Sequence, residues 1–293
     1  MKIIYPTATT LTSSNVTASA YADWDIATAY TVGQFVYLPS NYGEYEALTN
    51  NTGKDPSINP TDWKFLGTSN KYKMFDQFLN TQTSRLGTIE VEIVAYGSMA
   101  LYLGNIEAQS VTIEVVDNDT LNVIESETFS TYAVVSNWLG YFYGDWSENR
   151  RTSITYERTT LTRNISYLIT IDNGVYNAKC GIFTTGILKD LGFTKWGMNV
   201  GALDYSTVAI DTSSGATYLF QGNYAKRISA DIFAYTEGVQ SAYKTLTDIR
   251  GTPVVFINER FDDFNVYGYI QKFETLVNGP VETAITIEII GLI

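Results

Sequence analysis

Histidine is absent from this 293-residue chain, and cysteine occurs once, at Cys180. The absence of histidine excludes serine–histidine and cysteine–histidine catalysis, and it removes the most common ligand of catalytic zinc. A single cysteine can form neither an intrachain disulfide nor a thiolate metal cluster. No glycine-rich phosphate-binding motif is present either. The sequence therefore predicts no cofactor, no metal site and no nucleotide-dependent chemistry.

Long hydrophobic runs and positive charge are also scarce. No segment reaches the roughly 18 continuous apolar residues of a membrane-spanning helix, and the first residues lack the apolar run of a secretory signal peptide. Lys and Arg number 19 against 31 Asp and Glu, which gives a net charge of −12. Such a charge repels a phosphate backbone. We therefore expect neither nucleic-acid binding nor membrane insertion.

Carboxylates are the catalytic groups that remain, because two Asp or Glu residues at a suitable separation suffice for glycoside hydrolysis. Four of them stand close to aromatic residues: Asp145, Glu148, Asp262 and Asp263. In an acidic chain, solvated loop carboxylates are the ordinary interpretation of such residues. We predict no catalytic residue, and a carboxylate-based glycan hydrolase is the weaker alternative.

Aromatic residues, in contrast, make up 14% of the chain, and they include 22 Tyr and 14 Phe. Aromatic and β-branched side chains favour strands. Apolar and polar residues alternate with period two in four segments, 88–93, 111–115, 166–171 and 283–289, which indicates strands with one buried face. Turn signals separate such runs at 117–119, 172–174 and 213–215. We predict a mainly β fold with antiparallel sandwich sheets.

One segment has helical spacing instead. Within 237–249, Val239, Tyr243, Leu246 and Ile249 fall on one stripe, and Gly251 follows as a stop signal. This pattern predicts one short helix near 238–249. Arg250 to Phe256 then indicates a turn that leads into a buried strand.

An ordered set of residues marks the segment 24–67: Trp24, Tyr30, Gly33, Val36, Tyr45, Asn50, Asp55, Pro56, Trp63 and Gly67. The set resembles the small carbohydrate-binding module of bacterial chitinases and phage tail proteins, which implies a small three-stranded fold. A pyranose ring stacks its C–H face on an aromatic ring, and the resemblance makes Trp24, Tyr42, Tyr45 and Trp63 the carbohydrate-binding candidates. A module this small also needs such rings for its core, and both interpretations remain open at this stage.

The rest of the chain has further landmarks at 71–76, 82–84, 105–111, 178–181, 191–197, 203–206, 249–253 and 287–292. They resemble a family of phage tail-associated proteins in which such a module precedes a β-rich body. The resemblance implies a non-enzymatic structural component of a phage tail tip or baseplate, made in the host cytoplasm and located in the virion, with neighbouring tail proteins as partners. The alternative is an adhesin that binds host cell-surface polysaccharide.

These observations suggest four regions along the chain. We expect an extended N-terminal arm at 1–19, the module at 20–70, a β-sandwich at 71–174 and a second β-rich domain at 175–293. Phe75-Asp76 followed by Thr83 resembles the opening of galactose-binding-like jelly rolls, which supports the first sandwich. One large sandwich with insertions is the alternative division.

Two further features predict contacts between copies of the chain. Five aromatic residues lie within nine positions, too many for one face of a strand to bury: Trp138, Tyr141, Phe142, Tyr143 and Trp146. Dense Tyr and Trp mark association surfaces, although core packing is the alternative. Arg250 is a further candidate, because its planar guanidinium suits a carboxylate across an interface. The nearly uncharged arm and the sheet edges are expected to join copies into a homo-oligomer by strand addition.

Overall fold

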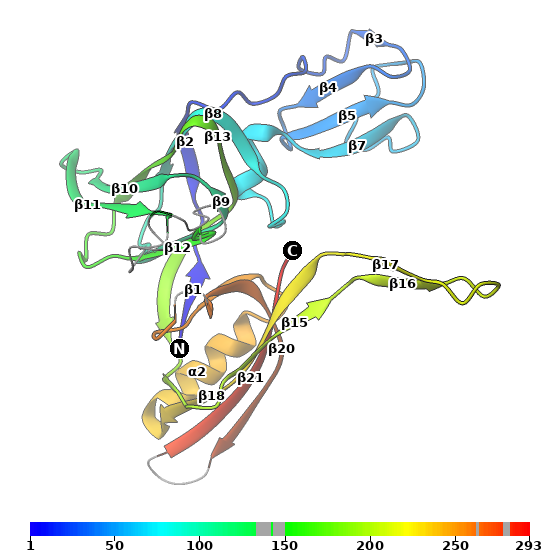
Figure 1. The fold of residues 1–293 in the computed structure, drawn as a ribbon. Coiled ribbons are helices and arrows are strands. Elements are labelled where there is room, and N and C mark those ends of the chain that lie inside the picture. The colour runs from blue at the N-terminus through cyan, green and yellow to red at the C-terminus, as the bar shows by residue number, and fades with distance from the viewer. Residues whose placement is uncertain (133–141, 143–149, 262–263, 278–281) are drawn as a thin grey trace.

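The computed structural model describes residues 1–132, 142, 150–261, 264–277 and 282–293 (Figure 1). Strands dominate these residues, and the named strands pair antiparallel, so the predicted mainly β fold class is confirmed. Figure 1 shows three bodies: a small N-terminal module, a central body and a C-terminal body that carries the helix.

The N-terminal module, residues 20–68, contains the predicted three-stranded sheet, in the order β4–β5–β7, and a two-stranded sheet β3–β6. Its strands are β3 (Ala29–Tyr30), β4 (Phe35–Leu38), β5 (Gly43–Ala47), β6 (Asn51–Thr52) and β7 (Trp63–Thr68). The core consists of Tyr30, Val36, Leu38, Tyr45, Ala47 and Trp63. With no disulfide available, this aromatic cluster holds the module together by packing.

Residues 67–70, at the end of the module, are packed against the protein. Ser69 is fully buried, and its backbone N–H donates to the carbonyl of Tyr42 at 2.8 Å. The Tyr42 ring stacks on Tyr72, with ring centroids 3.8 Å apart. Tyr72 belongs to the short 3-10 helix η1 (Asn70–Phe75), so the module is joined to the central body through side-chain contacts.

The central body encloses the largest buried cluster, and its strands alternate as the sequence predicted. In the three segments 88–93, 111–115 and 166–171, alternate residues face this core, as Ile89, Val91 and Ile93 do. The strands are β8 (Thr83–Val94), β9 (Ala100–Glu107), β10 (Ser110–Asp117), β11 (Asn122–Ser130), β12 (Ser153–Glu157) and the first part of β13 (Ile165–Asp190).

The C-terminal body packs one helix, α2 (Thr236–Asp248), against a sheet. Its strands are β14 (Phe193–Thr194), β15 (Asn199–Asp204), β16 (Thr207–Ile210), β17 (Thr217–Phe220), β18 (Tyr224–Tyr235), β19 (Val254–Ile257), β20 (Val266–Val277) and β21 (Glu282–Gly291). The predicted helix is confirmed, and Val239, Leu246 and Ile249 are buried. Tyr243 is 52% exposed and meets Phe273 edge-on, so its predicted place on the buried stripe was wrong; Ala242 is buried instead.

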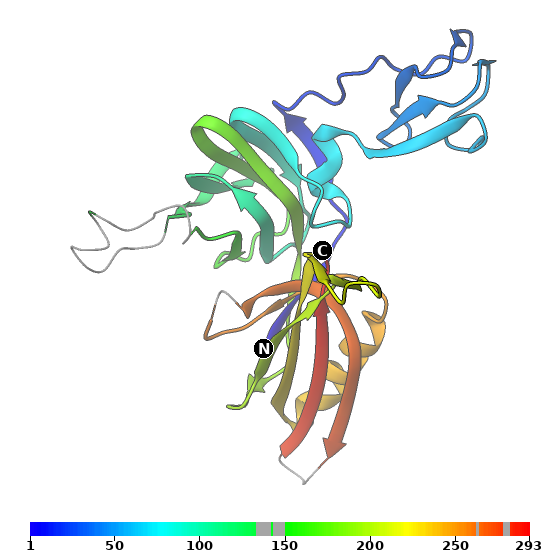
Figure 2. The ribbon, with the colours of Figure 1, turned by 45° about the vertical axis from the view of Figure 1, so that its right-hand side comes forward.

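The predicted extended arm at 1–19 is also corrected. Strand β1 (Lys2–Pro6) lies between β13 and β19, and β2 (Thr10–Ser14) pairs with β8. Met1, Ile3 and Ile4 are almost completely buried. Figure 2 shows β1 running from the C-terminal body toward the central body. The arm was misjudged because its few apolar residues stand among Thr and Ser, although a central strand needs only a short apolar stretch.

The division predicted near residue 174 does not hold, because β13 continues through it for 26 residues. The backbone N–H of Gly174 donates to Asp172 Oδ1 at 2.8 Å, and Gly174 has a φ of +63°. The register of β13 against β8 shifts between Asp172 and Asn177. The sequence Asp-Asn-Gly therefore makes a bulge here instead of a chain reversal. The partners of β13 change near Gly186, which pairs with both β9 and β1.

Candidate binding cleft and association hairpin

Two of the four predicted carbohydrate-binding residues are part of the module's core. Trp63 is 1% exposed, lies edge-on to Tyr30 and donates from Nε1 to the Lys54 carbonyl at 2.9 Å. Tyr45 is 5% exposed, and its hydroxyl accepts a hydrogen bond from Asn41. Sugar stacking requires an open ring face, so the prediction for Trp63 and Tyr45 is corrected: both rings serve as core.

The other two candidates are only partly available. Trp24 is half-buried against the same core. Tyr42 is 45% exposed, but one face of its ring is covered by Tyr72. The structure therefore brings no pair of open, coplanar rings together among the four residues that the sequence singled out.

The residues predicted to contact other copies of the chain fall in the segment 138–146 and at position 250 of the sequence. Trp138, Tyr141, Tyr143 and Trp146 lie outside the described residues, as do the four candidate carboxylates Asp145, Glu148, Asp262 and Asp263. Phe142 is 63% exposed. Arg250, at the end of α2, is exposed and donates from Nε to the Thr247 carbonyl at 3.1 Å.

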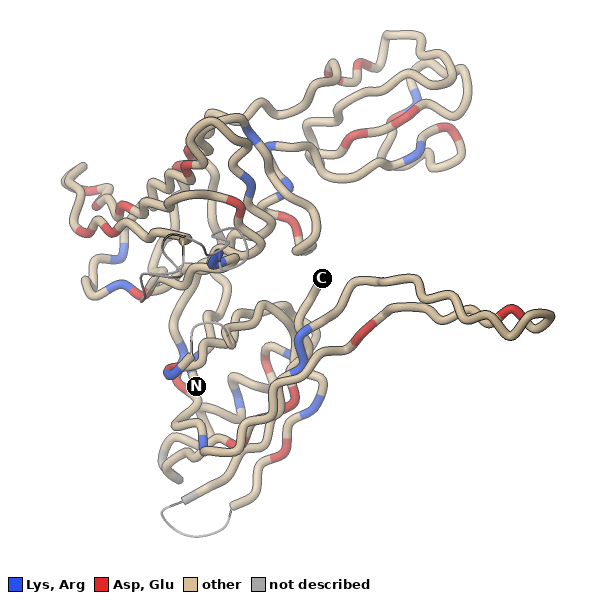
Figure 3. Tube along the Cα trace, in the orientation of Figure 1, with Lys and Arg blue, Asp and Glu red and all other residues tan. Residues whose placement is uncertain are grey.

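A surface that the sequence did not single out is the hairpin formed by β16 and β17. All eight residues of these two strands are exposed. Five of them are large and apolar: Val208, Ile210, Tyr218, Leu219 and Phe220. Figure 1 shows this association hairpin, residues 205–224, reaching far out from the C-terminal body. Asp211 is its one charged residue, and Figure 3 shows the hairpin almost free of charge.

Local hydrogen bonds shape the association hairpin at both ends. At the tip, hydrogen bonds from Ser214 and Ser213 lower the pKa of Asp211 to about 2. At the base, the Gly222 N–H donates to Ser206 Oγ at 2.9 Å, and a Cβ added at Gly222 would stand 2.5 Å from the Tyr205 carbonyl oxygen. The hairpin is thus fixed at its base while its strands remain uncovered.

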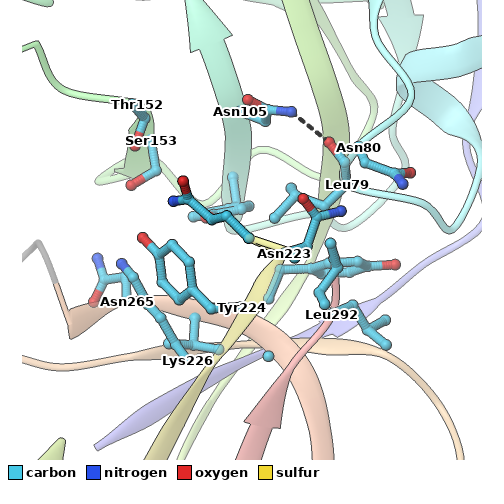
Figure 4. A pocket seen from close by; sticks show the side chains of 17 residues that line it. Leu79, Asn80, Asn105, Thr152, Ser153, Asn223, Tyr224, Lys226, Asn265 and Leu292 are labelled. Atoms are coloured by element: carbon cyan, nitrogen blue, oxygen red, sulfur yellow. Dashed lines mark hydrogen bonds between the residues drawn. The ribbon is translucent and has the colours of Figure 1, made fainter. Parts of the chain in front are cut away.

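A cleft of about 510 Å³ opens beside the base of the hairpin, between the central and C-terminal bodies (Figure 4). Residues from β9, β12, β18, β20 and the loop before β8 line it. Five of its side chains are carboxamides: Asn80, Asn105, Gln221, Asn223 and Asn265. No Asp or Glu is found among the described residues that line it. The cleft therefore offers groups that donate and accept hydrogen bonds, without the carboxylate pair that hydrolysis of a glycoside requires.

The five carboxamides differ in whether their side chains already form hydrogen bonds within the protein. Asn265 is buried, donates to Thr155 and accepts from the Asn258 N–H. Asn105 donates to the Leu79 carbonyl at 2.6 Å, as the dashed line in Figure 4 shows, and has a φ of +52°. The remaining three, Asn80, Gln221 and Asn223, are exposed, and their side chains form no hydrogen bond with a described residue.

Two buried tyrosines add hydroxyl groups to the cleft. Burial raises the pKa of Tyr102 to about 12 and that of Tyr267 to about 12, so both hydroxyls keep their protons at neutral pH. Tyr267 is 6% exposed and lines the cleft. The cleft therefore presents two protonated hydroxyl groups besides its carboxamides.

No protein family, curated protein or solved structure matches this chain. Within the described residues, no group of three or more His, Cys, Asp or Glu is placed to hold a metal ion. None of the helices in that part of the chain has the length and apolar character needed to cross a membrane.

Proposed function

We propose that this protein is a non-enzymatic structural subunit of a phage tail that assembles with copies of itself through the association hairpin. The observation that carries the proposal is the uncovered apolar surface of β16 and β17. The tail location rests on the landmark residues of the sequence, and the hairpin supplies a way for such a subunit to assemble.

A hairpin of this kind is poorly explained by the monomer alone. An isolated two-stranded hairpin is marginally stable in water, because it lacks a second layer that buries a face. Val208, Leu219 and Phe220 are 60%, 76% and 59% exposed. Apolar area removed from water contributes about 25 cal/mol per Å², so covering both faces with another protein would stabilise the hairpin and the assembly together.

Charge favours a second copy as the protein that covers the hairpin. The chain carries a net charge of −12, so contacts between copies through most of its surface bring like charges together. The association hairpin carries only Asp211, at its tip, and so avoids this repulsion. If the hairpin bound a positively charged protein, we would expect several carboxylates on its surface.

The alternative role, a host-glycan adhesin acting through the N-terminal module, is less well supported. It required open aromatic rings, and Trp63 and Tyr45 are buried. The glycan hydrolase alternative has no support from the described residues of the cleft, which include no carboxylate side chain.

Light scattering after size-exclusion chromatography tests the assembly directly. We expect the wild-type chain to form a defined oligomer and the variant Leu219→Ser/Phe220→Ser to be monomeric. The matched control is Val175→Ser/Tyr176→Ser, which replaces two residues of β13 that are 80% and 65% exposed. This variant should leave the oligomer intact. A wild-type chain that stays monomeric, or equal effects of the two variants, would contradict the proposal.

The tail location needs a separate test. Mass spectrometry and cryo-EM of purified particles of the phage that encodes the chain should find it as a symmetric ring in contact with tail proteins. Its absence from purified particles would rule out a virion component, even if the isolated chain forms oligomers.

A further inference from the structure

The cleft is lined by polar side chains that the proposed assembly through the association hairpin does not involve. Its three exposed carboxamides, Asn80, Gln221 and Asn223, come from two segments far apart in the sequence. Each carboxamide can donate and accept at the same time. Figure 4 shows the labelled side chains of Asn80 and Asn223 within one space, together with Tyr224 and Ser153. Unused hydrogen-bonding groups are therefore gathered on both sides of the cleft.

Aromatic surface is available beside these amides. Tyr224 follows Asn223 at the start of β18 and is 62% exposed. The apolar face of such a ring can stack on the C–H face of a pyranose, while neighbouring amides bind its hydroxyls. This is the combination that the N-terminal module lacks, because its Trp63 and Tyr45 are buried.

Tyr267 and Asn105 add fixed polar groups to the lining of the cleft. The Tyr267 side chain is nearly buried, and its hydroxyl keeps its proton at neutral pH. Asn105 donates to the Leu79 carbonyl and has a left-handed backbone conformation, which asparagine adopts more readily than most residues other than glycine. A ligand hydroxyl that reached Tyr267 could accept a hydrogen bond from it.

We propose that this cleft binds a neutral oligosaccharide. No Asp or Glu side chain lines the described part of the cleft, which disfavours a cationic ligand, and Lys226, the charged side chain of that lining, already has an interaction partner in the protein. The mixture of donors and acceptors suits hydroxyl groups, which both donate and accept. A volume of about 510 Å³ lies within the usual range for small-ligand sites. Residues 221–224, at the base of the association hairpin, line the cleft, whereas no residue of β16 or β17, which carry its exposed apolar side chains, does.

Isothermal titration calorimetry on the full chain tests this proposal with a fixed panel of probes. The panel is maltohexaose, cellohexaose, mannohexaose, galactohexaose and chitohexaose, with a neutral Gly–Ser hexapeptide as the non-sugar probe. We expect at least one sugar to bind, and Asn223→Ala/Tyr224→Ala to weaken it at least tenfold. Tyr267→Phe, which removes one hydroxyl, should weaken binding about two- to tenfold, the size of one neutral hydrogen bond.

Two control variants make the result specific. Tyr42→Ala, in the N-terminal module, should leave the affinity unchanged, and so should Leu219→Ser/Phe220→Ser, which separates binding from assembly. The proposal is overturned if no sugar of the panel binds, if the hexapeptide binds in place of the sugars, or if Tyr42→Ala abolishes binding while the cleft variants do not. Circular dichroism verifies that each variant is folded.

Discussion

The N-terminal module and the association hairpin are built from similar residues but use them in opposite ways. The module turns Tyr45 and Trp63 inward, where they form the core of a three-stranded sheet. The hairpin leaves Tyr218, Leu219 and Phe220 in solvent. What differs is the second layer: the module folds its loops over its sheet, whereas nothing in the described chain covers the hairpin. Aromatic density alone therefore does not distinguish a core from an exposed surface.

The largest expected effect belongs to the module. Trp63→Ala would remove a fully buried indole, and we expect it to lower the free energy of unfolding of the module by about 3–5 kcal/mol. Phe65→Ala on the same strand is the matched control, because Phe65 is 58% exposed, and it should cost less than about 1 kcal/mol. Urea unfolding followed by tryptophan fluorescence measures both; equal losses would mean that Trp63 is not a core residue.

A second comparison concerns two carboxylates whose pKa is low for different reasons. Burial opposes ionisation of Glu125, but hydrogen bonds from Tyr156, Thr160 and Thr159 outweigh it and lower its pKa to about 2. These partners lie more than thirty positions away in the sequence. The bonds to Asp211 come from Ser213 and Ser214 at the same turn. The ionisation of Glu125 therefore depends on the folding of the central body, whereas that of Asp211 depends only on a local turn.

The pH dependence of stability follows from this difference. Because the pKa of Glu125 is lower in the folded state than its ordinary value of 4.5, its contribution is complete above pH 4.5 and is lost as the pH falls toward 2. We expect Glu125→Gln to destabilise the protein at pH 7 and to have a smaller effect at pH 3. Asp211→Asn, the control, should not alter the pH dependence of global unfolding measured by urea titration at both pH values.

The association hairpin should contribute little to the stability of the monomer. At concentrations where the protein is monomeric, Leu219→Ser should change the free energy of unfolding by no more than about 0.5 kcal/mol, because the side chain is 76% exposed. Differential scanning calorimetry of the dilute protein checks this. A much larger loss would show that the hairpin is covered within its own chain.

Labelling of cysteine thiols distinguishes the buried core from the exposed hairpin, and it is the smallest of the expected effects. Cys180 is completely buried, and burial raises the pKa of its thiol to about 12. We expect no reaction with a disulfide reagent at pH 8 until urea unfolds the protein. At concentrations where the protein is monomeric, a Leu219→Cys variant should instead react at once with one equivalent of reagent. Rapid labelling of Cys180 in the native wild type would contradict its place in the core.

The strands and the helix could be predicted from the sequence because their signals are local. The alternation in 283–289 and the three-to-four spacing of Val239, Leu246 and Ile249 both predicted the observed burial. The position of β1 was not predictable in this way, because its place between β13 and β19 depends on pairing with residues about 180 and 250 positions away.

The cleft and the hairpin were missed for a related reason. Asn80 and Asn223 belong to different bodies, and no local pattern indicates that they share a cavity. The hairpin has the composition of an ordinary strand pair, and only its lack of a covering layer distinguishes it. The turn signal at 213–215 did predict the reversal between β16 and β17.

Strand β13 has a mechanical consequence. At a rise of about 3.3 Å per residue, its 26 residues trace a contour of roughly 80 Å through both larger bodies. A pulling force applied to one body would pass along this strand as tension and would shear its hydrogen bonds with β8, β9 and β1 together. Ladders loaded in shear share the force among many bonds, so the two bodies should yield as one unit under extension.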